Sequence, residues 1–172
     1  MRVFLVGYMG VGKTTIGKKI SSRLGLKFVD LDRVISSDVS MSIPQIVDSK
    51  GEEYFRLLER KALEKVSKMQ NVLVATGGGT PCFFDNIKRI NQSGVSVFLK
   101  LDEKSLIKRL NFNQNTRPLL KGKSPSELAD FVKSHYASRL PFYSQCDLDY
   151  NTLSMDQKSL DDLASKILDY SK

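Results

Sequence analysis

The 172-residue chain has no tryptophan, two cysteines and one histidine. Cys82 and Cys146 are far apart and outside any C-x-x-C pattern, which argues against a disulfide scaffold and favours a reducing compartment. The single histidine, His135, has no cysteine or second histidine at metal-ligand spacing, so a structural or surface role is expected for it. No uncharged apolar run reaches about eighteen residues, and the apolar stretch at the N-terminus is too short for a secretory signal. We therefore predict a soluble, cytoplasmic protein.

Acidic residues are the scarcer charge, 19 against 27 lysines and arginines, which gives a net charge of +8. Such an excess is found in proteins that bind nucleic acid, anionic membranes or small anions. The basic residues are dispersed, without a long basic block and without interleaved aromatic residues. Small anionic substrates are the favoured partners, with no nucleic acid and no membrane.

Apolar runs alternate with segments of helical period along the whole chain, and no linker or repeat interrupts them. The runs are continuously apolar, which is typical of parallel strands covered by helices on both faces. The pattern predicts one α/β domain over residues 1–172, a three-layer doubly wound parallel sheet. The expected strands are 3–6, 28–31, 72–75, 95–99 and 146–150; the expected helices are 14–24, 42 onward, 52–69, 85–92, 103–110, 126–136 and 160–170.

The first turn of this pattern carries a phosphate-binding loop. Residues 7–15 read GYMGVGKTT, which fits G-x-x-x-x-G-K-[ST] between a strand and a helix. In such a loop the backbone N–H groups of Gly10–Thr15 converge on phosphate oxygens, and the helix N-terminus adds its dipole. Lys13 would contact the β- and γ-phosphates, and the Thr14 hydroxyl would bind Mg²⁺. The motif indicates a nucleoside triphosphate.

Two carboxylates, Asp30 and Asp32, follow the second expected strand. The carboxyl ends of parallel strands are where ligands bind in this architecture. One carboxylate could hold metal-bound water while the other orients or deprotonates a substrate hydroxyl. The alternative is that Asp32 caps a short helix over 33–36, which would not exclude a role in catalysis.

Arg56 lies beside an apolar helical stripe formed by Phe55 and Leu58. Its guanidinium could bind a substrate carboxylate with two hydrogen bonds, although spacing alone favours an ion pair with Glu59 or Glu53. Three consecutive glycines, 77–79, directly follow a strand. Because three glycines are costly in folding entropy, close approach to a ligand explains them better than a turn.

Residues 111–123 form a polar segment too long for an ordinary connection, and they include Arg117. A loop arginine is usually solvated, but in a phosphoryl-transfer enzyme it can close over the triphosphate as part of a lid. Arg139 is a second candidate for a substrate carboxylate, and its alternative role is a cation at a helix C-terminus.

Taken in order, these motifs resemble one family, the shikimate kinases, a branch of the nucleoside-monophosphate-kinase-like P-loop proteins. The likeness covers nearly the whole chain. It rests on the segments GYMGVGKTT, DLD, SIPQIVDSKGEEYFRLLE, ATGGGT, NTRPLL and SRLPFY.

The resemblance implies a five-stranded parallel sheet of order 2-3-1-4-5, a lid over about 111–123 and a substrate-binding helical region over about 32–60. It implies transfer of the γ-phosphoryl group of ATP to the 3-hydroxyl of shikimate, a step in chorismate and aromatic amino acid biosynthesis, by a monomer that uses Mg²⁺. By the same likeness the site residues have the following roles: Lys13, Asp32 and Arg117 in catalysis; Gly10, Val11, Gly12, Lys13, Thr14, Thr15 and Arg117 at ATP; Asp32, Arg56, Gly78 and Arg139 at shikimate; Thr14 at the metal, with Asp30 near its water shell.

Many members of the family stack an arginine before the lid on adenine, and the matching region here reads Arg109-Leu110. The nearest alternative function is a related kinase of gluconate or a nucleoside monophosphate. A nucleotide acceptor would need a base pocket, whereas two arginines and a carboxylate suit a small hydroxylated acid better. A basic nucleic-acid-binding P-loop protein is the alternative from another class, and it would need a linear basic stripe.

Overall fold

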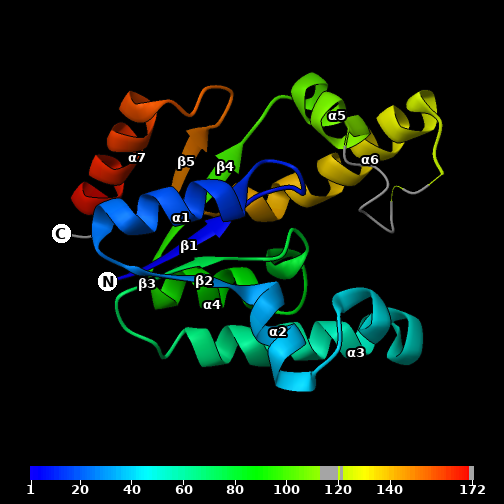
Figure 1. Cartoon of the computed structure of the whole chain (residues 1–172), viewed down its shortest axis with the longest axis horizontal. Coiled ribbons are helices and arrows are strands. Elements are labelled where there is room, and N and C mark those ends of the chain that lie inside the picture. The colour runs from blue at the N-terminus through cyan, green and yellow to red at the C-terminus, as the bar shows by residue number, and fades with distance from the viewer. Residues whose placement is uncertain (113–119, 121, 171–172) are drawn as a thin grey trace.

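A parallel five-stranded sheet forms the centre of the computed structural model, which describes residues 1–112, 120 and 122–170 (Figure 1). The strand order is β2-β3-β1-β4-β5, and every adjacent pair is parallel. This confirms the predicted fold and strand order. The strands are β1 (Arg2–Val6), β2 (Lys27–Asp30), β3 (Val72–Ala75), β4 (Val95–Lys100) and β5 (Leu148–Asn151).

Helices connect the strands and lie on both sides of the sheet, with α1 and α7 on one side and α3 and α4 on the other (Figure 1). Such crossovers are what parallel strands require. The helices are α1 (Lys13–Leu24), α2 (Leu31–Val39), α3 (Ile43–Val66), α4 (Asn86–Ser93), α5 (Glu103–Phe112), α6 (Pro125–Tyr143) and α7 (Gln157–Tyr170), with a 3₁₀ turn, η1, at Thr80–Cys82.

Side-chain caps begin several of these helices. Ser42 and Gln45 form the predicted capping box of α3, and Ser124 and Glu127 form a second one at α6. The carboxylate of Asp102 accepts a 2.9 Å hydrogen bond from the Ser105 N–H at the start of α5, as predicted. Each cap satisfies an N–H group that the first helical turn leaves without a backbone partner.

Three predicted boundaries were wrong. Strand β2 ends at Asp30 and α2 begins at Leu31, so Asp30 rather than Asp32 is the N-cap, with its carboxylate 3.4 Å from the Arg33 N–H. Helix α3 ends at Val66 rather than at Met69, although its predicted interruption at Gly51 (φ 85°, ψ 166°) is confirmed. Helix α6 continues past Tyr136 through Pro141 to Tyr143, so Arg139 lies inside it and is not a C-terminal cation.

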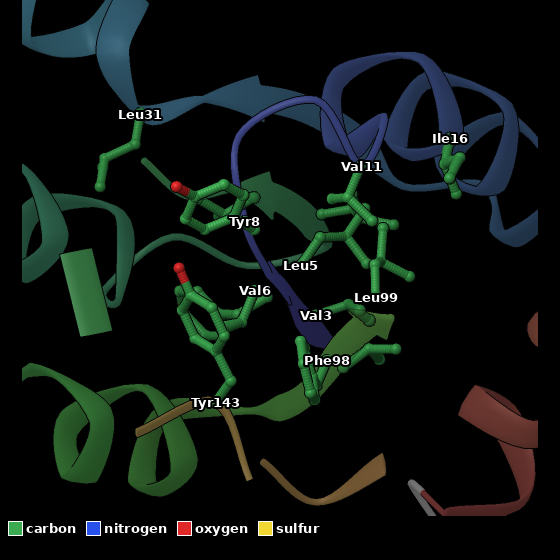
Figure 2. Close-up of a cluster of buried hydrophobic side chains, with 14 of the residues drawn as sticks. Val3, Leu5, Val6, Tyr8, Val11, Ile16, Leu31, Phe98, Leu99 and Tyr143 are labelled. Carbon is green, nitrogen blue, oxygen red and sulfur yellow. The ribbon is translucent and has the colours of Figure 1, made fainter. Parts of the chain in front are cut away.

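The core lies on both faces of the sheet and against the helices. Leu5, Val6 and Phe98 are at most 1% exposed, and they belong to one cluster with Tyr8 and Tyr143 at the carboxyl end of the strands (Figure 2). Full burial of a side chain of this size stabilises a fold by roughly 1.5–3 kcal/mol. The sheet therefore fixes the positions of the loops that follow β1 and β3 and of the start of α2 after β2.

Within the described part of the chain, no helix is long and apolar enough to cross a membrane. Of the expected lid at about 111–123, Asn111 and Phe112 end α5 and Leu120 is fully buried. Residues 113–119 and 121, and with them Arg117, lie outside the described residues.

Candidate active site

The phosphate loop joins β1 to α1 at the carboxyl end of the sheet. Gly10 and Gly12 have positive φ angles of 82° and 101°, which side chains rarely adopt. A β-carbon at Gly10 would also lie 2.9 Å from Leu110 Cδ2, so α5 packs closely over the loop. The Lys13 ammonium folds back on the loop and donates to the carbonyls of Gly7 at 2.6 Å and Tyr8 at 3.0 Å. This geometry fits a phosphate cradle with its lysine at the rim.

Thr14 and Asp30 form the part of the site that suits a metal ion. The Thr14 hydroxyl donates to Asp30 Oδ2 at 3.0 Å, which places two hard oxygen ligands at the mouth of the loop. Among the described residues, no group of three or more histidine, cysteine or carboxylate side chains is arranged to hold a metal ion. A magnesium ion commonly takes one or two protein oxygens and completes its shell with water and phosphate, and this pair fits that pattern.

The three glycines 77–79 bring the remaining candidate residues together. A β-carbon at Gly77 would lie 3.2 Å from Asp32 Oδ1 and 2.7 Å from Glu59 Oε1. One at Gly78 would lie 3.5 Å from Arg139 Nη1 and 3.4 Å from the Met9 nitrogen of the phosphate loop. One at Gly79 would lie 2.6 Å from Arg56 Nη1. Asp32, Arg56 and Arg139 therefore surround one short segment beside the phosphate loop.

Asp32 projects from the first turn of α2 into this segment. Asp32 is exposed to solvent as a residue, although many protein atoms surround its carboxylate. This desolvation, together with the negative charges of Glu59 and Asp30, raises the pKa of Asp32 to about 6 against the opposing charges of Lys13 and Arg56. A carboxylate with such a pKa can accept a proton near neutral pH.

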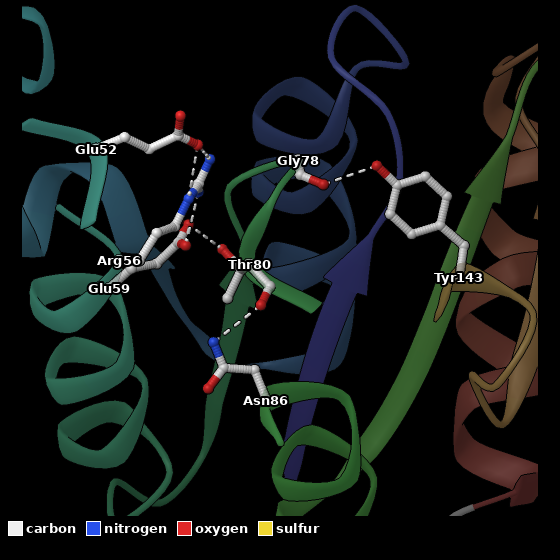
Figure 3. A network of polar contacts seen from close by, with 7 residues as sticks. All are labelled: Glu52, Arg56, Glu59, Gly78, Thr80, Asn86 and Tyr143. Atoms are coloured by element: carbon white, nitrogen blue, oxygen red, sulfur yellow. Dashed lines mark hydrogen bonds and ion pairs between the residues drawn. The ribbon is translucent and has the colours of Figure 1, made fainter. Parts of the chain in front are cut away.

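Arg56 is held by a network that Figure 3 shows. Its Nη1 donates to Glu59 Oε2 at 2.9 Å, and its Nη2 donates to Glu52 Oε1 at 2.9 Å. Glu59 Oε1 in turn accepts a 2.5 Å hydrogen bond from the Thr80 hydroxyl. The helical ion pair with Glu59 that spacing favours is thus present, whereas the second carboxylate is Glu52 and not Glu53.

The Phe83 ring lies under the Arg56 guanidinium, with Cζ 4.0 Å from the ring centroid. Only 12% of the Arg56 side chain is exposed. Ion pairs on one side and an aromatic face on the other fix the orientation of the guanidinium. Arg56 is therefore pre-organised rather than a solvated surface cation.

Arg139 lies next to Gly78, the middle residue of the glycine segment. The Tyr143 hydroxyl donates to the Gly78 carbonyl at 2.7 Å (Figure 3), and burial raises the pKa of Tyr143. Cys82 is half-buried nearby, and desolvation raises the pKa of its thiol to about 11, so it is protonated at neutral pH. The Gly78 main chain is held by a neutral hydrogen-bond donor.

Arg109 lies on the far side of the phosphate loop, where its guanidinium donates to the carbonyls of Val11 at 3.3 Å and Thr152 at 3.4 Å. Val11 is buried, and Thr15 is exposed on the first turn of α1. Arg109 therefore connects α5 to the phosphate loop at Val11 and to the segment after β5 at Thr152.

Sequence reasoning gave no site role to Glu59, Thr80, Tyr143 or Tyr8. Glu59 was considered only as a partner of Arg56, and its link to Thr80 spans two elements distant in sequence. A signal was present for Glu59, since it lies on the same helical stripe as Phe55, Ala62 and Val66 and is 1% exposed. A carboxylate on a buried stripe implies a charged partner.

Comparison with known proteins identifies the family. The shikimate kinase family model matches residues 9–172. A shikimate kinase of Parabacteroides distasonis is 46% identical over 154 residues, covering 90% of this chain and 89% of that protein. The crystal structure of shikimate kinase from Bacteroides thetaiotaomicron superposes with a TM-score of 0.90 at 37% identity, covering 99% and 97% of the two chains. Shikimate kinase from Acinetobacter baumannii in complex with shikimate gives a TM-score of 0.80 at 30% identity, covering 98% and 91%.

Three findings point to the same family: the phosphate loop, the carboxylate and arginine side chains around the three glycines, and the match along nearly the whole chain. The chain belongs to the shikimate kinase family.

Proposed function

We propose a mechanism for this member of the shikimate kinase family. The reaction transfers the γ-phosphoryl group of ATP to the 3-hydroxyl of shikimate. One observation supports the assignment above all: Gly77, Gly78 and Gly79 successively approach Asp32, Arg139 and Arg56, directly beside the phosphate loop. A hydroxylated acid fits such a site, since the two guanidinium groups match its carboxylate and Asp32 matches its hydroxyls.

In the proposed arrangement Arg56 and Arg139 bind the substrate carboxylate, and the Gly78 main chain contacts the ring substituents. Asp32 accepts the proton of the 3-hydroxyl as its oxygen attacks the γ-phosphorus. The bond from the γ-phosphorus to the β,γ-bridging oxygen breaks, and ADP leaves. Glu59 keeps Arg56 in place and contributes to the raised pKa of the base.

The phosphate loop, Gly10, Val11, Gly12, Lys13, Thr14 and Thr15, binds ATP in this proposal. Lys13 leaves the Gly7 and Tyr8 carbonyls and stabilises the negative charge on the transferred phosphoryl group. Thr14 would hold Mg²⁺, with Asp30 in contact through water, and the ion would neutralise phosphate charge. Arg117, from the proposed lid at about 111–123, would supply a further positive charge over the phosphates.

We further propose a monomer that folds as one kinase domain over 1–172, with a substrate-binding helical region over about 32–60 that supplies Asp32 and Arg56. Sedimentation velocity across a range of protein concentrations tests the oligomeric state.

The acceptor is tested by ADP release in the presence of shikimate, gluconate and nucleoside monophosphates, with NMR locating the phosphate on the product. We expect kcat/KM to be highest for shikimate and the phosphate to be on the 3-oxygen. A higher kcat/KM for gluconate or a nucleotide would overturn the proposal, and tight oligonucleotide binding at physiological salt would favour the nucleic-acid alternative.

Asp32→Asn tests the base, because it keeps the shape and removes the negative charge. We expect kcat to fall by about 10²–10⁴, with ATP affinity unchanged. If ATP affinity fell and turnover of the bound complex did not, Asp32 would belong to the nucleotide site.

A further inference from the structure

Tyr8, the second residue of the phosphate loop, contacts both the proposed nucleotide site, at Lys13, and helix α6, which carries Arg139. Its side chain is buried, 1% exposed, at the carboxyl end of the strands (Figure 2). Its carbonyl accepts a hydrogen bond from Lys13 Nζ at 3.0 Å. Its hydroxyl is hydrogen-bonded to His135 Nδ1 at 2.7 Å, across 127 positions of the sequence. One residue therefore joins the nucleotide lysine to helix α6.

The face of α6 that meets Tyr8 also carries Arg139. His135 and Arg139 are four residues apart, so they lie on the same side of the helix. The Tyr8 ring meets His135 edge-on, with centroids 5.5 Å apart, and Arg139 Cζ lies 5.9 Å from its centroid. Tyr136 packs edge-on against the same ring at 5.4 Å. Three side chains of this helix face therefore contact the Tyr8 ring.

A neutral histidine allows the Tyr8 hydroxyl to donate this hydrogen bond. Burial and the positive charges of Arg139 and Arg56 lower the pKa of His135 to about 4, against the opposing charge of Glu52. His135 is neutral at physiological pH, and with its proton on Nε2 the Nδ1 atom accepts from the tyrosine hydroxyl. A neutral acceptor also avoids a second positive charge next to Arg139.

We propose that the hydrogen bond between Tyr8 and His135 positions Arg139 for the substrate carboxylate by holding α6 against the phosphate loop. Tyr8 and His135 are positioning residues in this proposal, and they act on shikimate only through Arg139. The proposal rests on the assignment of Arg139 to the carboxylate. It predicts that loss of the Tyr8 hydroxyl weakens recognition of the acid and does little to recognition of its methyl ester.

The test compares Tyr8→Phe, Arg139→Ala and the double variant, with KM measured for shikimate, its methyl ester and ATP. Because one net hydrogen bond is at stake, we expect Tyr8→Phe to raise the KM for shikimate about threefold to tenfold. The KM for the ester should change less than twofold. The double variant should be no worse than Arg139→Ala alone, since the hydroxyl acts through Arg139.

Two substitutions of His135 separate loss of the hydrogen bond from a general loss of packing. In His135→Asn the amide oxygen takes nearly the place of Nδ1, so the acceptor is kept, whereas His135→Leu removes it. We expect the asparagine variant to resemble the wild type and the leucine variant to resemble Tyr8→Phe. These two variants decide the question even if Tyr8→Phe fails to fold. Tyr170→Phe is the matched control, because its hydroxyl bonds Asp147 at 3.0 Å in another part of the molecule.

The outcomes separate the two proposals. If Arg139→Ala leaves the KM for shikimate unchanged, the carboxylate assignment is wrong and the positioning role falls with it. If Arg139→Ala raises this KM but Tyr8→Phe and His135→Leu do not, only the positioning role is overturned. Equal losses for acid and ester in Tyr8→Phe would likewise overturn it, because they would show a general disturbance of the site.

Discussion

The Arg56 guanidinium and the Glu59 carboxylate form an ion pair 2.9 Å long, one helical turn apart, with the glutamate side chain 1% exposed. An ion pair at this depth is costly to break from one side, because the remaining charge loses its partner without gaining water. Arg56 therefore contributes to stability as well as to the proposed binding of substrate.

Arg56→Ala should lower the free energy of unfolding by about 3–5 kcal/mol, since it leaves the Glu59 charge buried and unpaired. Adding Glu59→Gln should restore part of the loss, because the amide is neutral and can still accept from Thr80. Urea unfolding of both variants measures this difference. If the double variant were less stable than Arg56→Ala alone, Glu59 would be stabilised by contacts other than Arg56.

The pH dependence of kcat/KM should reflect the ionisation of Asp32, the proposed general base. Asp32 must be ionised to accept a proton, so kcat/KM for shikimate should be half-maximal near pH 6 and fall about tenfold per unit below it. The negative charge of Glu59 raises the pKa of Asp32, and Glu59→Gln should therefore move this midpoint to lower pH. A shift to higher pH in Glu59→Gln would contradict the assignment of this limb to Asp32.

Gly79→Ala should weaken acceptor binding selectively. The new methyl group would start 2.6 Å from Arg56 Nη1, so the guanidinium must shift, at a cost to its buried ion pair with Glu59. The guanidinium would then leave its place over Phe83 and beside Glu59. We expect the KM for shikimate to rise by about tenfold, the worth of roughly one charge-assisted hydrogen bond, and the KM for ATP to stay within about twofold. Equal rises for both substrates would refute a specific effect on Arg56.

Tyr143→Phe removes the hydrogen bond to the Gly78 carbonyl. A buried carbonyl left without its donor costs about 1–3 kcal/mol, and a looser Gly78 should raise the KM for shikimate. The matched control is Tyr150→Phe, whose hydroxyl donates to the Ser159 carbonyl at 2.8 Å on the edge of the sheet. The control should lose stability without a change in KM. A similar KM change in both variants would show that the effect is not local to Gly78.

The sheet and the phosphate loop could be predicted from sequence because their signals are local. Val72–Ala75 is a short apolar strand bounded by polar residues and glycine, and its predicted limits match the structure. Lys13 and Thr14 follow the motif spacing directly. Asp30 and Asp32 were harder to assign, because an aspartate after a strand can end that strand, cap a helix or do both; here Asp30 does both.

Contacts between distant segments could not be predicted in the same way. Pairs such as Tyr8 with His135, or Glu59 with Thr80, depend on how helices settle on the sheet, and no periodicity encodes that. The end of α6 was also missed. The predicted helix stopped at Tyr136, whereas α6 continues through Pro141 to Tyr143.

The most direct test of the proposed site uses the substrate carboxylate itself. The ratio of kcat/KM for shikimate to kcat/KM for its methyl ester is measured in the wild type, Arg56→Ala and Arg139→Ala. Because both values come from one sample, the ratio does not depend on the folded fraction of a destabilised variant. Each charge-assisted hydrogen bond is worth roughly 1.5–3 kcal/mol, so the acid-over-ester preference should fall about tenfold to a hundredfold in each variant. The same preference in all three proteins would show that neither arginine binds the carboxylate.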